Sequence, residues 1–402
     1  MATEIYLTDE KTTDIILILI DRINLTLIYK IMKKNYFLAL LICLLVSSCT
    51  DDTMENQSIL SESTVLTKYP IKEIVIKTEN KDRFRSLMLN NLPATKAGYL
   101  LKDSIWTNGG GHSMIYETNE YTLTPDIWKY IYVGSLLKGG SIENQRFTPL
   151  SNRIEPIKVS YSFPARWVVD EIPIPALTAQ RQSIQNIMNK EGMSGTQLVS
   201  FSYDMNQFSY YDELKLEFGC NINIGTLLNI NININKGKIR NKTGLVAKFV
   251  QKNFTLDMDL PLDGCILLNN GELSGIRGFD PVYISSITFG RLGIITLDSK
   301  YSFDELSVAV SAALTAKVVN GNLNISAYHK QILSESNLKI TIIGGKSDGS
   351  VKTVEGFEEF KNFLINGGTY SAQNPGDPIF YTASYLSDNS PFYSRFRIDI
   401  QN

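Results

Sequence analysis

The sequence contains little of what enzymes and metal proteins use for chemistry. Only two histidines occur among 402 residues, His112 and His329, which disfavours a histidine-based triad or metal site. The four cysteines form no CxxC motif and no regular ladder of spacings, so no zinc site or disulfide framework is readable. No nucleophile elbow, HExxH motif or pair of carboxylates at a telling spacing is present. We therefore expect no enzyme activity, no catalytic residues, no metal and no cofactor.

An excess of basic charge is also absent. The chain has 39 Lys and Arg against 41 Asp and Glu, a net charge of −2, so nucleic acid is not expected as a partner. Hydrophobic residues make up 43% and charged residues 20% of the chain, which is typical of a globular protein with a sizeable core. The length suits one large domain or two to three ordinary ones.

The apolar run from Phe37 to Val46 is too short to cross a bilayer as a helix. It follows two lysines after Met32 and ends in Val-Ser-Ser-Cys, so residues 32–48 have the three parts of a secretory signal peptide. This ending resembles a bacterial lipobox and predicts lipidation of Cys49; an ordinary signal peptide with an incidental cysteine is the alternative. Because a signal peptide must be N-terminal, we interpret residues 1–31 as a misassigned extension.

Residues 49–67 are polar and acidic and are interpreted as a flexible tether. The pair Asp51-Asp52, just after the lipidated cysteine, suits export to a bacterial outer membrane or cell surface. We therefore expect a surface lipoprotein, either anchored or released.

The remaining chain has a mixed pattern. Residues 72–77 and 155–163 alternate like strands, and residues 175–190 have apolar residues at helical spacing. The glycine-rich stretch 107–113 is interpreted as a turn, since no lysine or helix signal follows it. No repeat of 20–50 residues and no regular βαβ alternation is visible, so the predicted fold class is α+β.

One stretch, "CNINIGTLLNINININKGK" (Cys220–Lys238), alternates isoleucine with asparagine. Counted from Leu214 to Ile234, ten of the eleven even positions are apolar, against one of the ten odd positions between them. Because side chains alternate across a strand, this spacing predicts a ribbon with one apolar and one polar face. Besides Cys220, the apolar even positions are Leu214, Leu216, Phe218, Ile222, Ile224, Leu228, Ile230, Ile232 and Ile234.

Two turns compete for this ribbon. A turn at Lys236-Gly237 places Ile239 opposite Ile234 and continues the apolar face on odd positions, at Ile239, Leu245, Ala247 and Phe249. A turn at Gly225-Thr226-Leu227 keeps even parity on both arms, and the sequence leaves both open.

A second stretch, 304–330, behaves in the same way. Asn320-Gly321 is a strong hairpin signal that would pair Val318 with Leu323. The same stretch begins with the capping box Ser302-Phe303-Asp304-Glu305 and is rich in alanine, both of which favour a helix. The apolar positions are Leu306, Val308, Val310, Ala312, Leu314, Val318, Leu323 and Ile325.

These two segments suit a switch between two conformations. In lipid, only a closed barrel satisfies every backbone group of a β-structure, and it needs ribbons that are apolar outside and polar inside. Two hairpins give four strands, too few to close a water-filled pore, so many copies would have to contribute. The alternative is that both segments are strands half-buried in a sandwich.

Other stretches resemble the cholesterol-dependent (thiol-activated) cytolysins. "DPVYISSITFGRLGIITLDS" (Asp280–Ser299) is similar to the segment before that family's second transmembrane hairpin. Residues 339–389 are similar to the stretch that follows it, including the Gly-Gly, Asn-Pro and Pro-x-x-Tyr-Thr elements. Residues 131–137 and 158–164 look more weakly like strands of the family's first domain.

The resemblance implies a MACPF/CDC-like fold, with a bent central antiparallel sheet flanked by helical clusters. It implies soluble monomers that form rings on a membrane and unfold both clusters into β-hairpins, one in residues 214–250 and one in 302–330. Gly344 and Gly345 fall at a hinge where an edge strand swings away. Glycine tolerates the backbone angles a hinge needs, and an exposed sheet edge is a template for another chain.

The sequence departs from the family at its end. It stops at "YSRFRIDIQN", about where the family continues into a C-terminal β-sandwich that recognises cholesterol. Nothing resembles that domain's tryptophan-rich loop or cholesterol pair, and neither Cys220 nor Cys265 corresponds to its reactive thiol. We expect a short relative without the sandwich and without cholesterol binding, which finds membranes by its own anchor or through a longer homologous partner.

The predicted organisation is discontinuous. Residues 68–197, 251–282 and 367–402 are assigned to the first two domains, and residues 198–250 and 283–366 to the pore-forming domain. The predicted function is a pore-forming toxin subunit whose partners are the bilayer and other copies of itself. A non-lytic surface lipoprotein that uses the same scaffold for adhesion or complex formation is the alternative.

Overall fold

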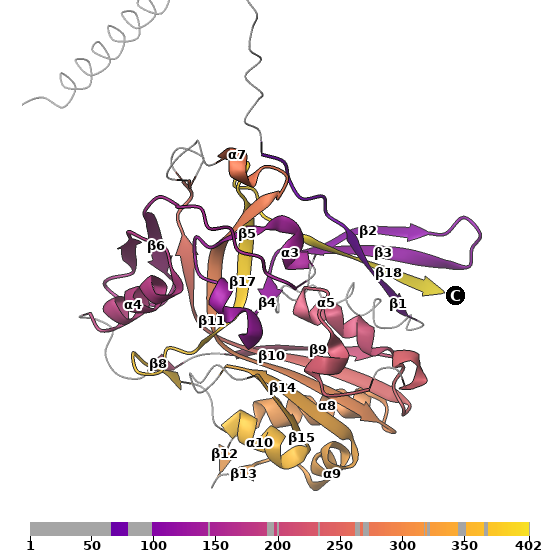
Figure 1. Cartoon of the computed structure of the whole chain (residues 1–402). Coiled ribbons are helices and arrows are strands. Elements are labelled where there is room, and N and C mark those ends of the chain that lie inside the picture. The colour runs from indigo at the N-terminus through magenta and orange to yellow at the C-terminus, as the bar shows by residue number, and fades with distance from the viewer. Residues whose placement is uncertain are drawn as a thin grey trace, which may run out of the picture. The chain divides into compact units, whose positions relative to one another are not determined.

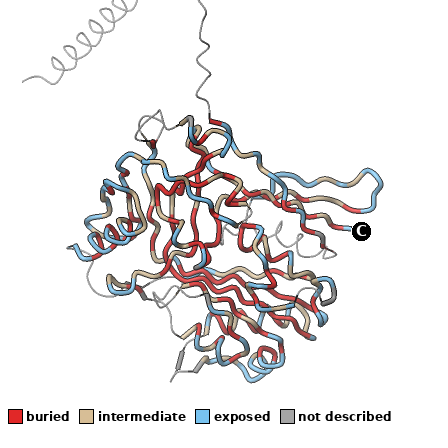
Figure 2. Tube along the Cα trace, in the orientation of Figure 1, coloured by how far each residue is buried: buried red, intermediate tan, exposed pale blue. Residues whose placement is uncertain are grey.

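Two long strands, β10 (Thr243–Met258) and β11 (Pro281–Ser299), form the centre of the fold. They pair antiparallel from Thr243 opposite Ser299 to Asp257 opposite Ser286, with one register shift between Lys252 and Phe254. Both strands are buried along most of their length (Figure 2), because they are apolar and covered on both faces.

The computed structural model describes residues 66–78, 99–143, 145–190, 197–198, 201–231, 234–261, 266–267, 273–316, 318–319, 322–344, 351–365 and 369–401. Residues 64–402 form one compact unit, to which this description refers. Residues 1–31, the predicted signal peptide, the lipidation site Cys49 and the tether up to residue 65 lie outside the described residues, so those assignments stay predictions.

Around the two long strands, the central sheet has the order β15-β14-β11-β10-β6-β7. One half of the sheet, here called the distal half, is formed where β9 pairs with β10 and β14 with β11. In the other, proximal half, β6 pairs with β10, and β5 and β17 pair with β11. The long strands change direction between the halves (Figure 1). The added strands are β4 (Tyr121–Thr122), β5 (Leu136–Lys138), β6 (Ile157–Tyr161), β7 (Val169–Ile172), β9 (Phe201–Phe208), β14 (Asn337–Ile343), β15 (Val351–Glu355) and β17 (Asp377–Tyr385).

The distal half has two covered faces. On face A, even-numbered residues such as Val246 and Ile294 belong to the largest apolar core. On face B, odd-numbered residues such as Leu245 and Leu297 belong to a second core. Face A is covered by η2 (Tyr211–Leu214), α5 (Lys215–Phe218) and α6 (Ile224–Leu227), and face B by α8 (Phe303–Thr315), α9 (Ala327–Glu335) and α10 (Phe357–Ile365).

A separate four-stranded sheet joins strands from both ends of the described chain. Its order is β1-β18-β3-β2, with β1 and β18 parallel and the other pairs antiparallel. Leu216 of α5 packs into its core beside Ile76 and Ile398. The strands are β1 (Glu73–Thr78), β2 (Tyr99–Ile105), β3 (Gly111–Thr118) and β18 (Ser394–Gln401).

Several local predictions are confirmed. Strands occupy 73–78 and 157–161, and α4 spans Leu177–Met188. The predicted turn at 107–113 ends at Gly110, because the chain enters β3 at Gly111 and pairs there with Gln401. The predicted α+β architecture, a central antiparallel sheet flanked by helices, is also confirmed.

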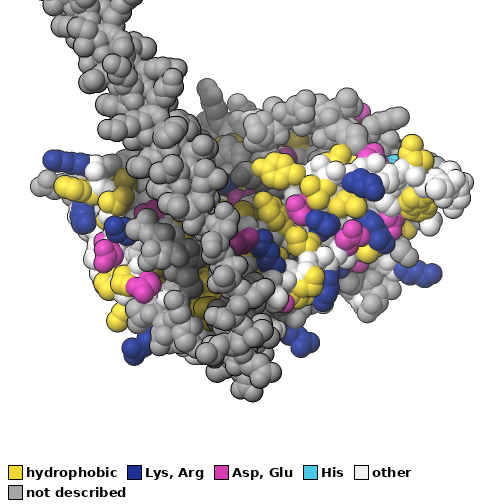
Figure 3. All heavy atoms as spheres, turned by 90° about the horizontal axis from the view of Figure 1, so that it is seen from above, with side chains coloured by type: hydrophobic (Ala, Val, Ile, Leu, Met, Phe, Trp, Pro, Cys, Tyr) yellow, Lys and Arg dark blue, Asp and Glu magenta, His cyan; other side chains and the backbone are white. Residues whose placement is uncertain are grey.

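The remaining elements are short. They are η1 (Pro125–Tyr130), α3 (Gly139–Glu143), β8 (Gln197–Leu198), η3 (Ile234–Gly237), α7 (Leu273–Ile276), β12 (Val318–Val319), β13 (Asn322–Leu323) and β16 (Thr369–Tyr370). Within the described ranges, every helix is too short or too polar to span a bilayer. Figure 3 shows one face of the molecule, on which basic and acidic side chains are interspersed among hydrophobic ones.

Candidate functional site

The first candidate segment, residues 209–242, connects β9 to β10 and consists of short helical turns. Most of its even-numbered apolar residues are directed into the core on face A, whereas Leu216 packs into the core of the four-stranded sheet. Leu214, Leu216, Phe218, Ile224 and Leu228 are buried, and Ile222 and Ile230 are half-buried. The side chains of Ile232 and Ile234 lie outside the described residues.

Local sequence supports these turns only weakly. The Asn223 side chain accepts a hydrogen bond from the Thr226 amide at 3.1 Å and so caps α6. Gly219 ends α5 in the left-handed region, at a φ of 69°. Both α5 and α6 have four residues, far below the length at which an isolated helix is stable in water.

Contacts with distant elements hold the first segment in place. Glu213 accepts hydrogen bonds from the Thr78 hydroxyl of β1 at 2.7 Å and from the Tyr210 amide at 2.9 Å. The buried Lys248 of β10 donates to the Glu217 carbonyl at 2.9 Å. The segment is therefore tied to both sheets by buried polar bonds, which are expensive to leave unmade.

Cys220 lies in the same core. Burial raises the pKa of its thiol from 9.0 to about 12, so the group stays protonated and unreactive at neutral pH. This fits the sequence-based inference that Cys220 is not a counterpart of a reactive thiol.

The second segment, residues 300–336, lies on face B and has strong local support. Ser302 and Glu305 form the predicted capping box, which is confirmed. These bonds from Ser302 lower the pKa of Glu305 to about 2. In α9, the Ser326 side chain accepts from the His329 amide at 3.1 Å. Near its end, Glu335 accepts from Tyr301 and Lys300, and these bonds lower its pKa to about 2.

Most predicted residues of this segment pack into the face B core, with one exception. Leu306, Val310 and Leu314 are buried, and Ala312, Leu323 and Ile325 are half-buried. Val308 is 55% exposed on the outer side of α8, so helix packing gives no reason for an apolar residue there. The predicted pairing of Val318 with Leu323 is confirmed by β12 and β13, although the predicted turn residues Asn320 and Gly321 and the Val318 side chain lie outside the described residues.

Three residues predicted for the first ribbon lie elsewhere. Leu245, Ala247 and Phe249 are in β10, on face B and under the second segment. They are already paired with β9, from Gln207 to Tyr203. Their odd parity therefore places them on the face opposite to the even-numbered residues of the first segment, because successive side chains of a strand alternate.

The predicted hinge lies at the end of β14. Gly344 has a φ of 78°, and a Cβ there would lie 2.7 Å from the Gly290 carbonyl oxygen, so only glycine fits without strain. Gly345 lies outside the described residues.

Sequence reasoning missed Arg291, a residue of β11 that fastens α10 to the sheet. Arg291 is 7% exposed, and its Nη1 donates to the Phe363 carbonyl of α10 at 2.7 Å. Its guanidinium lies 4.5 Å from the centre of the Phe363 ring, and burial lowers its pKa to about 10. An arginine between two glycines in an otherwise apolar strand, "FGRLGII", was the available signal.

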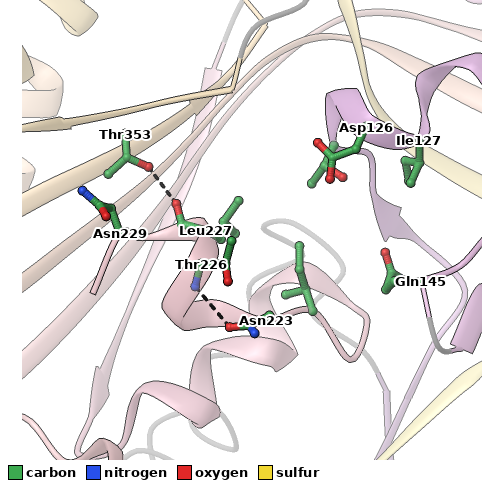
Figure 4. Close-up of a pocket in the computed structure, with 10 residues that line it drawn as sticks. Asp126, Ile127, Gln145, Asn223, Thr226, Leu227, Asn229 and Thr353 are labelled. Atoms are coloured by element: carbon green, nitrogen blue, oxygen red, sulfur yellow. Dashed lines mark hydrogen bonds between the residues drawn. The ribbon is translucent and has the colours of Figure 1, made fainter. Parts of the chain in front are cut away.

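A pocket of about 530 Å³ opens beside α6 (Figure 4). Asp126 and Gln145 line one side, and Asn223, Asn229 and Thr353 line the other. The Thr353 hydroxyl donates to the Leu227 carbonyl at 2.8 Å at its edge. The tip of the first segment therefore contacts β15.

Comparisons with known proteins agree with one another. The family profile for thiol-activated cytolysins matches residues 112–395. Tetanolysin of Clostridium tetani is 28% identical over an alignment of 252 positions, which covers 59% of this chain and 46% of tetanolysin. Perfringolysin O of Clostridium perfringens is 24% identical over 384 residues, covering 90% of this chain and 74% of perfringolysin O. The match thus spans about half the length of tetanolysin and about three quarters of perfringolysin O.

The solved structures extend this likeness to the fold. The crystal structure of wild-type pneumolysin superposes with a TM-score of 0.57 over 76% of this chain and 67% of pneumolysin, at 21% sequence identity. At that identity the superposition shows a shared fold alone.

Proposed function

Because the chain belongs to the thiol-activated cytolysin family, we propose that it is a pore-forming subunit whose two helical segments become transmembrane β-hairpins. Members of this family are pore-forming toxins rather than enzymes, so family membership confirms the prediction that the chain is not an enzyme. This proposal rests on the register in which the strands of the distal half of the sheet pair with one another.

The register of β9 and β10 supports one form of the first hairpin. Gly244 pairs with Phe208 and Gln251 with Phe201. Continued without a break, this register pairs Ile230 with Ile222 and puts the turn at Gly225-Thr226-Leu227. Of the two turns that the sequence left open, we therefore propose this one, with the hairpin formed by residues 209–242.

The register of β11 and β14 supports the second hairpin. Leu292 pairs with Ile343 and Asp298 with Asn337. Continued outward, this register pairs Val308 with Ala327 and Val310 with Ile325. The pairing seen in β12 and β13 differs from it by an even number of residues, so the predicted residues from Leu306 to Leu314, together with Leu323 and Ile325, keep the same face in both arrangements. Val318 is the exception, because the continued register places it in the turn.

The single observation that carries the proposal is agreement between these two registers. Even residues of β9, β10 and β11, with odd residues of β14, share face A. Extended in register, both hairpins put their apolar residues on this face and the asparagine-rich positions of the first hairpin on the other. A barrel in lipid requires such a continuous apolar face.

Assembly follows from the number of strands. Two hairpins supply four strands, so we propose a ring of many copies, with a longer homologous chain as a candidate co-assembling subunit. The ring requires free edges at β9 and β14, and β14 becomes free when β15 swings away at Gly344 and Gly345. A surface-anchored precursor, lipidated at Cys49, is part of the same proposal and rests on the sequence alone.

The test uses two adjacent residues of α8. Val308→Lys adds a charge to a residue that is already 55% exposed, so the soluble fold should be unaffected. In the barrel this lysine would face lipid, which costs about 2–4 kcal/mol per copy near the midplane, and we expect dye leakage from liposomes to be lost. Ser307→Lys, the matched control, would face the lumen and should keep leakage.

Leakage is measured for the mature chain alone and mixed with a longer homologue, after thermal melting confirms that each variant is folded. Equal leakage from Val308→Lys and wild type would contradict the proposed lipid face. If the wild type fails to leak under every condition, the non-lytic lipoprotein is the better description.

A further inference from the structure

The edge strand β15 contacts more than its neighbour β14. On face A, Thr341 of β14 lies opposite Thr353 of β15, and Lys339 lies opposite Glu355. Their side chains interact across the strands, with 3.2 Å between the two threonine hydroxyls and 2.6 Å between Lys339 Nζ and Glu355 Oε1. These two pairs lie on the side of the β14–β15 ladder that faces the first segment.

Each pair also donates one hydrogen bond to the first segment. The Thr353 hydroxyl donates to the Leu227 carbonyl at 2.8 Å, as Figure 4 shows, and therefore accepts from Thr341. Lys339 Nζ donates to the Asn229 carbonyl at 3.2 Å. Leu227 is the last residue of α6, where helix carbonyls have no partner within the helix, and Asn229 follows the C-cap residue Leu228.

The bonds are placed at the tip of the segment. By the register of β9 and β10, Gly225-Thr226-Leu227 is the turn of the extended hairpin. Extending residues 209–225 as a strand carries this turn roughly 55 Å from the end of β9. The turn cannot travel while Thr353 and Lys339 hold the carbonyls beside it.

We propose that Thr353 and Lys339 form a latch that couples the departure of β15 from β14 to the release of the first segment. The proposal rests on the proposed function for its purpose, although the coupling itself is a property of the soluble chain. When β15 leaves, Thr353 leaves with it, and Lys339 loses the carboxylate that positions its ammonium group. When the first segment leaves, the two cross-strand pairs lose their carbonyl acceptors. Coupling between two such events is reciprocal.

The second segment is held differently. It packs on the same β15–α10 unit through apolar contacts, with Leu306 and Leu333 in one core with Phe357 and Phe360. The latch is therefore specific to the first segment.

Hydrogen exchange of the soluble chain, without membrane, tests the latch. The reporters are the amides of Leu227, Leu228 and Ile230, which are bonded within the α6 region. Thr353→Val keeps the shape and removes the hydroxyl, and we expect these amides to exchange about 2- to 10-fold faster. Thr296→Val is the matched control, since the Thr296 hydroxyl donates to the Lys339 carbonyl within the sheet. It should leave the three amides unchanged.

A disulfide tests coupling directly. Ile342 and Lys352 are cross-strand neighbours on face B, away from the latch, so Ile342→Cys with Lys352→Cys would hold β15 in place. Oxidation should slow exchange at Leu227, Leu228 and Ile230, and reduction should reverse this. In a protein that also carries Thr353→Val and Lys339→Met, the disulfide should no longer change the exchange rates of these three amides.

Two outcomes overturn the latch. One is equal acceleration by Thr353→Val and Thr296→Val, which would indicate a general weakening of the sheet. The other is an oxidised disulfide that leaves the three amides unchanged. If Thr353→Val does not fold, Lys339→Met takes its place in the comparison with Thr296→Val, because it removes the other bond of the latch, from Lys339 to the Asn229 carbonyl. Because no membrane is present in the exchange experiments, a result that overturns the latch does not contradict pore formation. Absence of dye leakage, in turn, does not contradict the latch.

Discussion

Residues 209–242 and 300–336 occupy opposite faces of the same sheet, yet their own sequences support a helix to very different degrees. The first segment alternates isoleucine with asparagine and forms helices of four residues. The second is rich in alanine, begins with a capping box and forms helices of 13 and nine residues. Asparagine and glycine are poor helix formers and alanine is the best.

This difference shows what determines the conformation of each segment in the soluble chain. In the first, bonds to Thr78, Lys248 and Thr353 impose helical turns on a sequence with a strand pattern. In the second, the sequence carries its own helix signals as well as the alternation of a strand. We therefore expect the first segment to depend on its contacts and the second to keep helix when single contacts are lost.

The largest expected effect comes from truncating one buried leucine in each segment. Leu228 and Leu306 are both fully buried, and leucine-to-alanine changes at such sites destabilise by about 2–5 kcal/mol. In Leu228→Ala, we expect residues 224–230 to open locally, with at least about 30-fold faster amide exchange. In Leu306→Ala, the amides of α8 should keep most of their protection while the melting temperature falls.

Hydrogen exchange and thermal melting of both variants distinguish the segments. Unchanged exchange of residues 224–230 in Leu228→Ala would break the comparison, because the first segment would then hold its turns without its anchor. Loss of the α8 helix in Leu306→Ala would also contradict the comparison, because the second segment would then depend on a single contact.

A smaller effect is expected from the capping box. Ser302→Ala removes the N-cap of α8 and should destabilise the protein by about 0.5–2 kcal/mol. Thermal melting at neutral pH measures this change. The matched change in the first segment, Asn223→Ala at the N-cap of α6, should speed exchange only within residues 224–230.

Lowering the pH tests the N-cap of α8 in a second way. The folded-state pKa of Glu305 is lowered from 4.5 to about 2 by its bonds from Ser302. A group with a depressed folded pKa contributes stability that is present above its unfolded pKa and is lost as pH falls through the folded value. We therefore expect α8 to loosen between about pH 4.5 and pH 2. Glu305→Gln should remove that part of the pH dependence, and an unchanged profile in this variant would exclude the cap as its source.

Sequence alone predicted the elements whose signals are local. The capping box at Ser302 and the pairing of Val318 with Leu323 were both readable, because the interacting residues lie within a few positions of each other. The family resemblance of residues 280–299 implied a central antiparallel sheet flanked by helices, although not that this segment forms the centre of the sheet.

The conformation of the first segment could not be read from its own residues. Its alternation favours a strand, and only the family resemblance implied a helical resting state. The bond that fixes Glu213 comes from Thr78, 135 residues away. The position of Leu245, Ala247 and Phe249 was likewise decided by pairing of β10 with β9, and parity alone could not choose between two turns that are both allowed.

The smallest expected effect compares two exposed threonines on the helices of the two segments. Thr226→Ala in α6 and Thr315→Ala in α8 make the same change at exposed positions, and alanine favours a helix by up to about 0.7 kcal/mol. Thr315 already donates to the Ser311 carbonyl at 2.7 Å, so little should be gained in α8. In α6, helix propensity is scarce, so the same change should slow both amide exchange of residues 224–230 and dye leakage from liposomes by up to about threefold. If instead Thr315→Ala slows leakage more than Thr226→Ala, release of the second segment limits the rate, and the first is not the more loosely held of the two.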